Sequence, residues 1–172
     1  MANYSVKLVD HTGSPERWRQ GLKKAIQDLF DQCFAATSDS VIVDWGMGAA
    51  SDNLVLHFVE DVDHSYVQEK LPGAPLKEYI GGHTRTRNSI SGSEFYKFTG
   101  IRGQRGQNKY TGYAKLALHE SMHNLLPDWT DADMHGPEGG AGLAASPPHL
   151  PPTDKNKELV QRGFSVKNAQ LQ

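Results

Sequence analysis

Apolar residues recur at two different spacings along the chain, and the change of spacing predicts an order of strands and helices. From Tyr4 to Val9 apolar and polar residues alternate loosely, which predicts a short strand. Between residues 16 and about 36 the apolar positions recur every three or four residues, which predicts a long helix. Ser14 and Pro15 are expected as its N-cap and first residue. The apolar face of this helix consists of Trp18, Leu22, Ile26, Leu29 and Cys33.

Two apolar runs follow and predict further strands. Val41 to Trp45 forms one, and Leu54 to Val59 is almost continuously apolar, as expected of a central strand. We interpret His57 in the second run as a core residue, and Asp61, Asp63 and His64 as a solvated turn. The apolar pattern then weakens as far as Tyr110. In this region we expect a short strand around Phe95 to Phe98 between two glycine- and arginine-rich loops. These loops, at residues 81–87 and 100–106, are expected to be solvated, although they could form a basic rim that contacts a substrate.

The last third of the sequence is expected to hold two helices separated by irregular chain. Apolar positions at helical spacing predict a helix over residues 111–126, which Pro127 terminates. The next stretch is polar and then rich in glycine and proline, so no regular structure is expected from Gly136 to Pro152. Thr153 or Asp154 should begin a last helix that ends near Gly163, with a frayed tail after Lys167.

Composition narrows the possible functions. The 172 residues carry a formal net charge of −2, which disfavours a general nucleic-acid binder. The single cysteine, Cys33, excludes an internal disulfide framework. No run is apolar enough for a membrane span or a Sec signal. We therefore expect one soluble domain, cytoplasmic or exported by a route that needs no signal peptide, with no membrane or nucleic-acid partner and an oligomeric state that the sequence does not define.

The chemistry-bearing motif lies on the predicted helix at residues 111–126. His119 and His123 are separated by four positions, so both imidazoles can reach one metal ion from the same helix face. Glu120 is rotated by about 100° around the helix, where a carboxylate can act on a metal-bound water instead of binding the metal. This pattern indicates one catalytic zinc ion with Glu120 as general base, and such a site takes a third protein ligand.

The third ligand has to come from elsewhere in the sequence. His135 is our choice, because a third neutral imidazole matches the other two and the following glycines permit tight backbone packing. The other candidates are Asp128, Asp131, Asp133, Glu138 and His149. Two interpretations without catalysis also exist: solvent-facing histidines beside an ordinary glutamate, and a structural zinc site with four closed ligands.

The His119-Glu120-x-x-His123 motif and the order of elements resemble the zincin metallopeptidases, and the order is similar to the metzincin branch. Leu126 and Trp129 occupy the positions at which metzincins have a glycine and their third ligand, and no methionine turn follows. The resemblance therefore implies a metzincin-like offshoot with a longer loop before the third ligand.

The resemblance implies an α+β, zincin-like fold in a single metallopeptidase domain, 1–172. Its upper part would be residues 1–126, with the active-site helix at 111–126, and its lower part residues 127–172. It also implies peptide-bond hydrolysis in a protein or peptide substrate, which an edge strand within residues 91–98 could bind in extended form. A housekeeping protease, a phage enzyme and a toxin effector fit equally well. The alternatives are a zinc amidase acting on a non-protein amide such as a peptidoglycan crosslink, and a catalytically silent binding module stapled by zinc.

Overall fold

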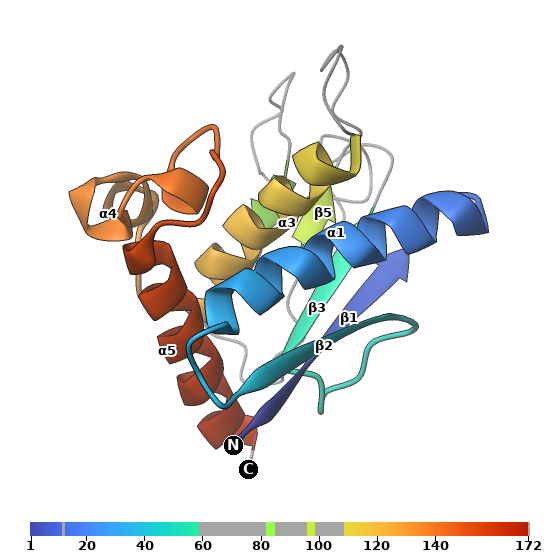
Figure 1. Cartoon of the computed structure of the whole chain (residues 1–172), viewed down its shortest axis with the longest axis horizontal. Coiled ribbons are helices and arrows are strands. Elements are labelled where there is room, and N and C mark those ends of the chain that lie inside the picture. The colour runs from blue at the N-terminus through green and yellow to red at the C-terminus, as the bar shows by residue number, and fades with distance from the viewer. Residues whose placement is uncertain (12, 59–81, 85–95, 99–108, 172) are drawn as a thin grey trace, which may run out of the picture.

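The computed structural model describes residues 1–11, 13–58, 82–84, 96–98 and 109–171. The described part combines strands and helices, which confirms the α+β class (Figure 1). Its strands are β1 (Asn3–Asp10), β2 (Ser40–Trp45), β3 (Leu54–Phe58), β4 (Gly82–Thr84) and β5 (Tyr96–Phe98). Its α-helices are α1 (Glu16–Phe34), α3 (Lys109–Leu125), α4 (Asp131–His135) and α5 (Asp154–Leu171). Two 3-10 helices, η1 (Pro137–Gly139) and η2 (Gly142–Ala144), lie between α4 and α5.

The strands form one mixed sheet in the order β2-β1-β3-β5-β4. β1 pairs in parallel with both β2 and β3, and β3 pairs in parallel with β5. β3 thus takes the central position that its almost continuously apolar sequence predicted. β4 pairs antiparallel with β5 and is the outermost of the described strands on that side of the sheet.

The two short strands β4 and β5 correct two predictions. Gly82–Thr84 lies within a segment expected to be a loop, yet it forms strand β4. Its pairing with β5 is a tertiary contact that the local glycine- and arginine-rich sequence does not reveal. β5 confirms the strand expected around Phe95 to Phe98, but it is paired on both sides and is therefore not the edge strand. Residues 91–95, the loop at residues 100–106 and the turn with Asp61, Asp63 and His64 lie outside the described residues.

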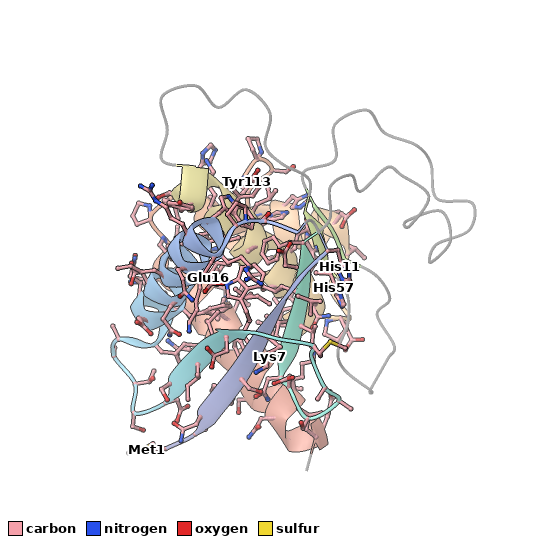
Figure 2. All side chains as sticks on the ribbon, turned by 90° about the vertical axis from the view of Figure 1, so that its right-hand side faces the viewer. Met1, Lys7, His11, Glu16, His57 and Tyr113 are labelled. Atoms are coloured by element: carbon pink, nitrogen blue, oxygen red, sulfur yellow. The ribbon has the colours of Figure 1, made fainter. Side chains whose placement is uncertain are left out.

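Helices α1 and α3 pack on one face of the sheet, and α5 crosses against both of them (Figures 1 and 2). The core lies between these layers, where Leu8, Leu56, Phe30, Leu118 and Phe164 are fully buried. Two glycines allow the helices to approach closely. A Cβ on Gly21 would lie 2.5 Å from the Tyr110 ring, and one on Gly163 would lie 2.6 Å from Leu125 Cβ. α3 is therefore held between α1 and α5.

The start of α1 differs slightly from expectation. Pro15 is the N-cap, with extended backbone, and no side chain caps the helix. The Ser14 amide instead donates to Asp10 Oδ2. Cys33 is buried on this helix, as expected of a small apolar residue.

The C-terminal part is more regular than predicted. The short helix α4 forms in the polar stretch before Gly136, where no element was predicted, and the 3-10 helices η1 and η2 lie within the stretch from Gly136 to Pro152 that was expected to be irregular. Helix α5 continues to Leu171, well beyond the predicted end near Gly163. Buried Phe164 and the contact of the Lys167 ammonium with Asn124 Oδ1 hold its second half against the rest of the molecule. Tertiary packing thus extends a helix that its own sequence supports weakly.

His57 is not the core residue that we expected. The buried side chains of β3 at Leu54, Leu56 and Phe58 point to the helices, so His57 lies on the opposite face of the strand and is only partly buried. Its Nδ1 is 2.8 Å from His11 Nε2, and Figure 2 shows the two rings together at the ends of β1 and β3. Among the described residues, no helix is both long and apolar enough to cross a membrane.

Candidate metal centre

Helix α3 carries the first two histidines and the glutamate of the motif. Its apolar side chains, among them Ala114, Leu118 and Met122, are fully buried and fix the rotation of the helix about its axis. His119 and Glu120 are buried as well, with exposed fractions of 6% and 7%. Burial of His119, with partial burial of His123, argues against the interpretation in which these two histidines simply face solvent beside an ordinary glutamate.

Helix α4 supplies the third histidine. The helix is short, but it begins with a capping box: Asp133 N donates to Thr130 Oγ1, and Thr130 N donates to Asp133 Oδ2. Fully buried Met134 anchors its other end. These two features place the next residue, His135, beside the histidines of α3.

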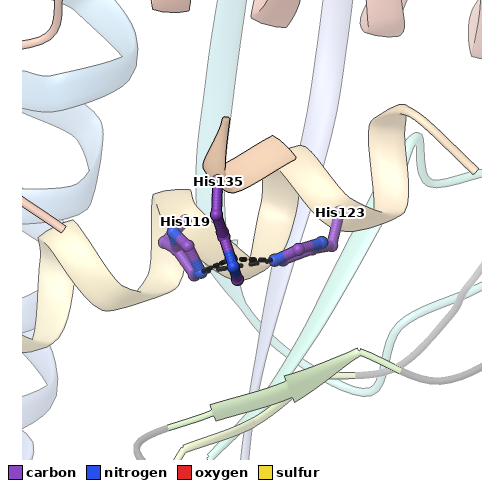
Figure 3. Close-up of side chains that lie close together, drawn as sticks. All are labelled: His119, His123 and His135. Carbon is purple, nitrogen blue, oxygen red and sulfur yellow. Dashed lines mark hydrogen bonds between the residues drawn. The ribbon is translucent and has the colours of Figure 1, made fainter. Parts of the chain in front are cut away.

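The three imidazoles converge on one point. The Nε2 atoms are separated by 3.3 Å for His119 and His123, 3.4 Å for His119 and His135, and 3.3 Å for His123 and His135 (Figure 3). Zinc binds imidazole nitrogens at about 2.0–2.1 Å, and two ligands at tetrahedral angles are then about 3.3–3.4 Å apart. The spacing of the Nε2 atoms thus fits a tetrahedral metal ion, and these three residues could hold one.

The protonation of His119 also suits a ligand. Its Nδ1 lies 2.7 Å from the carbonyl oxygen of Leu143. A carbonyl can only accept a hydrogen bond, so Nδ1 carries the hydrogen and the Nε2 of the neutral ring carries the lone pair. Burial lowers the pKa of His119, against smaller opposing effects of the Leu143 carbonyl and of Asp131. The neutral, metal-binding form is therefore favoured.

His135 is more exposed than His119, but its pKa is shifted in the same direction. Burial lowers it first, and the neighbouring His119 lowers it further, while Asp131 raises it. At both His119 and His135 the uncharged imidazole is thus favoured, which is the form that binds a metal ion.

Among the described residues, the other candidate ligands are not part of the cluster. Asp131 Oδ1 lies 3.7 Å from Nδ1 of His123, the nitrogen that does not face the other histidines, and Asp133 is engaged in the capping box. Asp128, Glu138 and His149 are exposed. Cys33 lies on α1, and burial raises its pKa to about 12, so it stays a protonated thiol and not a thiolate ligand.

Sequence reasoning missed two parts of the site, the Leu143 carbonyl and Asn156. A backbone carbonyl has no sequence signature. Asn156 does leave a weak one, because it stands three residues after Thr153 and completes a reciprocal cap of α5. That spacing identifies Thr153 as the N-cap, but it does not reveal that the same amide also binds the segment before it.

No family model matches the sequence, and no curated protein matches it either. Function is therefore inferred from the side chains themselves. Three imidazoles converge on one point, and a buried glutamate follows the first of them on the same helix.

Proposed function

We propose that the chain is a zinc-dependent metallopeptidase in which His119, His123 and His135 hold one zinc ion and Glu120 is the general base. The observation that carries this proposal is the spacing of the three Nε2 atoms at the edge lengths of a tetrahedron. Three histidines leave one position of such a tetrahedron open, which is the arrangement of catalytic zinc sites, whereas structural sites are closed by four ligands.

Zinc bound there would supply a Lewis acid that polarises the scissile carbonyl and makes a water molecule acidic near neutral pH. The protein's part is to accept and return a proton. Glu120 follows His119 on a helix held on both sides by α1 and α5, so its carboxylate has a fixed position relative to the histidines. It would take the proton of the attacking water and pass it to the leaving amine.

A peptide substrate is supported by the sheet edge. Among the described strands β4 is the outermost, next to β5, and both strands contact α3, which carries the motif. An edge strand offers backbone groups with which an extended peptide can pair. This assigns to β4 the role that the sequence suggested for residues 91–98. We therefore propose a metzincin-like offshoot of the zincins that acts on protein or peptide.

The test is substitution of the proposed base. Glu120→Gln should retain one zinc per chain while hydrolysis of an unfolded protein substrate falls by about 10²–10⁴-fold, the usual contribution of a general base. Glu138→Gln, on an exposed glutamate of the C-terminal part, is the matched control and should keep both zinc and activity.

Two outcomes would contradict the proposal. Loss of zinc together with activity in Glu120→Gln would make Glu120 a ligand. Zinc-loaded wild type that cleaves isolated peptidoglycan and no protein would replace the peptidase by an amidase.

A further inference from the structure

The loop formed by residues 139–143, here the 139–143 loop, joins the metal centre to helix α5. Its last residue, Leu143, presents the carbonyl that orients His119. Its first residue, Gly139, lies so close to α4 that an added Cβ would be 1.8 Å from the Met134 carbonyl oxygen, directly before His135. The loop therefore touches the supports of two of the three histidines.

The backbone of this loop is in a conformation that seldom persists unaided. Gly140, Ala141 and Gly142 have φ angles of 81°, 53° and 55°. A positive φ costs little for glycine, but it is unfavourable for Ala141, so neighbouring contacts have to maintain it. Few of these contacts are apolar, because Ala141 is exposed and its neighbours are glycines.

Asn156, fully buried in the first turn of α5, provides the missing contacts. Its Oδ1 accepts hydrogen bonds from Leu143 N at 2.8 Å and Thr153 N at 3.0 Å. Its Nδ2 donates to the Gly139 and Ala141 carbonyls, both at 2.9 Å. The four partners use the whole hydrogen-bonding capacity of the amide and define which side is oxygen and which is nitrogen.

We propose that Asn156 is a positioning residue of the metal centre. Its side-chain amide holds the 139–143 loop, and Leu143 then transmits that position to His119. A single residue makes the link, because Leu143 N binds Asn156 and Leu143 O accepts from His119 Nδ1. The carbonyl fixes the ring orientation and keeps the hydrogen on Nδ1, so that the lone pair of Nε2 faces the other histidines.

The proposal rests on the proposed metal binding, and zinc itself is the first probe. Asn156→Asp keeps the size and the accepting oxygen but replaces the donor by a second oxygen facing the Gly139 and Ala141 carbonyls. Its affinity for Zn²⁺, measured against a competing chelator, should fall about 10–100-fold, as for other outer-shell partners of metal ligands. The visible spectrum of the Co²⁺-substituted protein should change as well, since it reports ligand geometry.

Val160→Ala, one turn further along α5, is the matched control. Val160 is fully buried, so its truncation also lowers the melting temperature, but it makes no hydrogen bond to the 139–143 loop. Zinc affinity and Co²⁺ spectrum should stay as in the wild type. A folded Asn156→Asp variant with wild-type affinity and spectrum would overturn the proposal, and so would an equal loss in Val160→Ala.

A second pair of variants serves if Asn156→Asp does not fold. The Thr153 hydroxyl donates to the Gly140 carbonyl at 2.9 Å and supports the same loop. Thr153→Val removes this bond together with the cap bond from Asn156 N to Thr153 Oγ1, and it should weaken zinc binding at least about fivefold, the usual effect of one neutral hydrogen bond. Thr153→Ser keeps the hydroxyl and should restore the affinity. Equal affinities in the two variants would contradict the proposal.

Metal-free protein separates failure of this proposal from failure of the proposed function. Nitrogen NMR of His119 should show hydrogen on Nδ1 in the wild type and a mixture of tautomers in Asn156→Asp. If the tautomer changes but the wild type binds no zinc, the metallopeptidase is wrong, and what stands is only that Asn156 positions His119. If the wild type binds zinc but neither tautomer nor affinity changes, the positioning is wrong and the metal site stands.

Discussion

Two regions of the molecule are stabilised by different kinds of interaction. One is the sheet with helices α1 and α3, here the frame, and the other is the segment from Pro127 to Thr153, here the C-terminal segment. The sheet with α1 and α3 is stabilised by large apolar side chains, such as Leu22, Phe30 and Leu56, that are fully buried. The segment from Pro127 to Thr153 has few such anchors, chiefly Met134 and Leu143. It is shaped instead by hydrogen bonds from polar side chains, namely Thr130, Asp133, Thr153 and Asn156.

The candidate metal centre lies where these two parts meet. The frame contributes His119, Glu120 and His123 on helix α3, and the C-terminal segment contributes His135 and the Leu143 carbonyl. A metal ion would thus tie a rigid frame to a segment that has little apolar core of its own. Substitutions in the frame should therefore mainly change folding stability, whereas substitutions in the C-terminal segment should mainly change zinc affinity.

Damage to the frame should have the largest effect, on folding alone. Phe30 is fully buried and packs edge-on against Phe164 of α5, so Phe30→Ala should lower the free energy of unfolding by about 3–5 kcal/mol. Urea titration of the metal-free protein measures this. Ile42→Ala, at an exposed position of β2, should change stability by less than about 0.5 kcal/mol. A loss of zinc affinity in folded Phe30→Ala would contradict this separation between the frame and the C-terminal segment.

Removal of the ligand on the C-terminal segment should instead weaken zinc binding and leave folding stability nearly unchanged. His135→Ala should weaken zinc binding by more than the ~100-fold that marks the upper range for outer-shell partners. Because His135 is exposed, the unfolding midpoint of the metal-free protein should barely move. His149→Ala is the matched control in the same segment. Calorimetric titration with zinc compares the two, and equal affinities would remove His135 from the site.

A smaller effect is expected at Asp131. Its carboxylate lies on the Nδ1 side of His123, so it can orient the ring but does not join the cluster. Asp131→Asn should keep one zinc per chain and weaken binding by roughly tenfold, near the lower limit for outer-shell changes. Asp128→Asn, also exposed, should bind like the wild type. If zinc analysis finds no metal in Asp131→Asn, the aspartate is a ligand.

The smallest effect concerns pH. Burial lowers the pKa values of His119 and His135 below their ordinary value of 6.5, so the unfolded chain binds more protons than the folded one in that range. The stability of metal-free protein should therefore be full above pH 6.5 and fall as the pH drops below it. Urea titrations across this range test the sign, and His119→Gln should flatten the profile more than His149→Gln. A stability that increases toward acid pH would contradict it.

The same contrast explains what the sequence could predict. Alternating and helical periodicities identify β1, α1, β2, β3 and α3, because in the frame burial is the main determinant. The His119 and His123 pair follows from helix geometry alone. β4 was missed because its partner strand, not its own composition, makes it a strand.

The C-terminal segment follows less obvious rules. Its short helices depend on reciprocal caps such as Thr130 with Asp133, and its loop depends on one amide far along the chain. His135 could be chosen from the chemistry of the ligand set. The Leu143 carbonyl and Asn156 could not, because a hydrogen bond across 13 residues leaves no local pattern.

X-ray absorption at the zinc edge, on protein loaded with one equivalent of zinc, tests the central claim most directly. The proposed site predicts three imidazole nitrogens and one further light atom at about 2.0–2.1 Å from the metal. In His135→Ala one imidazole should be lost, and in His149→Ala none. A sulfur ligand at about 2.3 Å, or an unchanged imidazole number in His135→Ala, would show that the metal is held elsewhere.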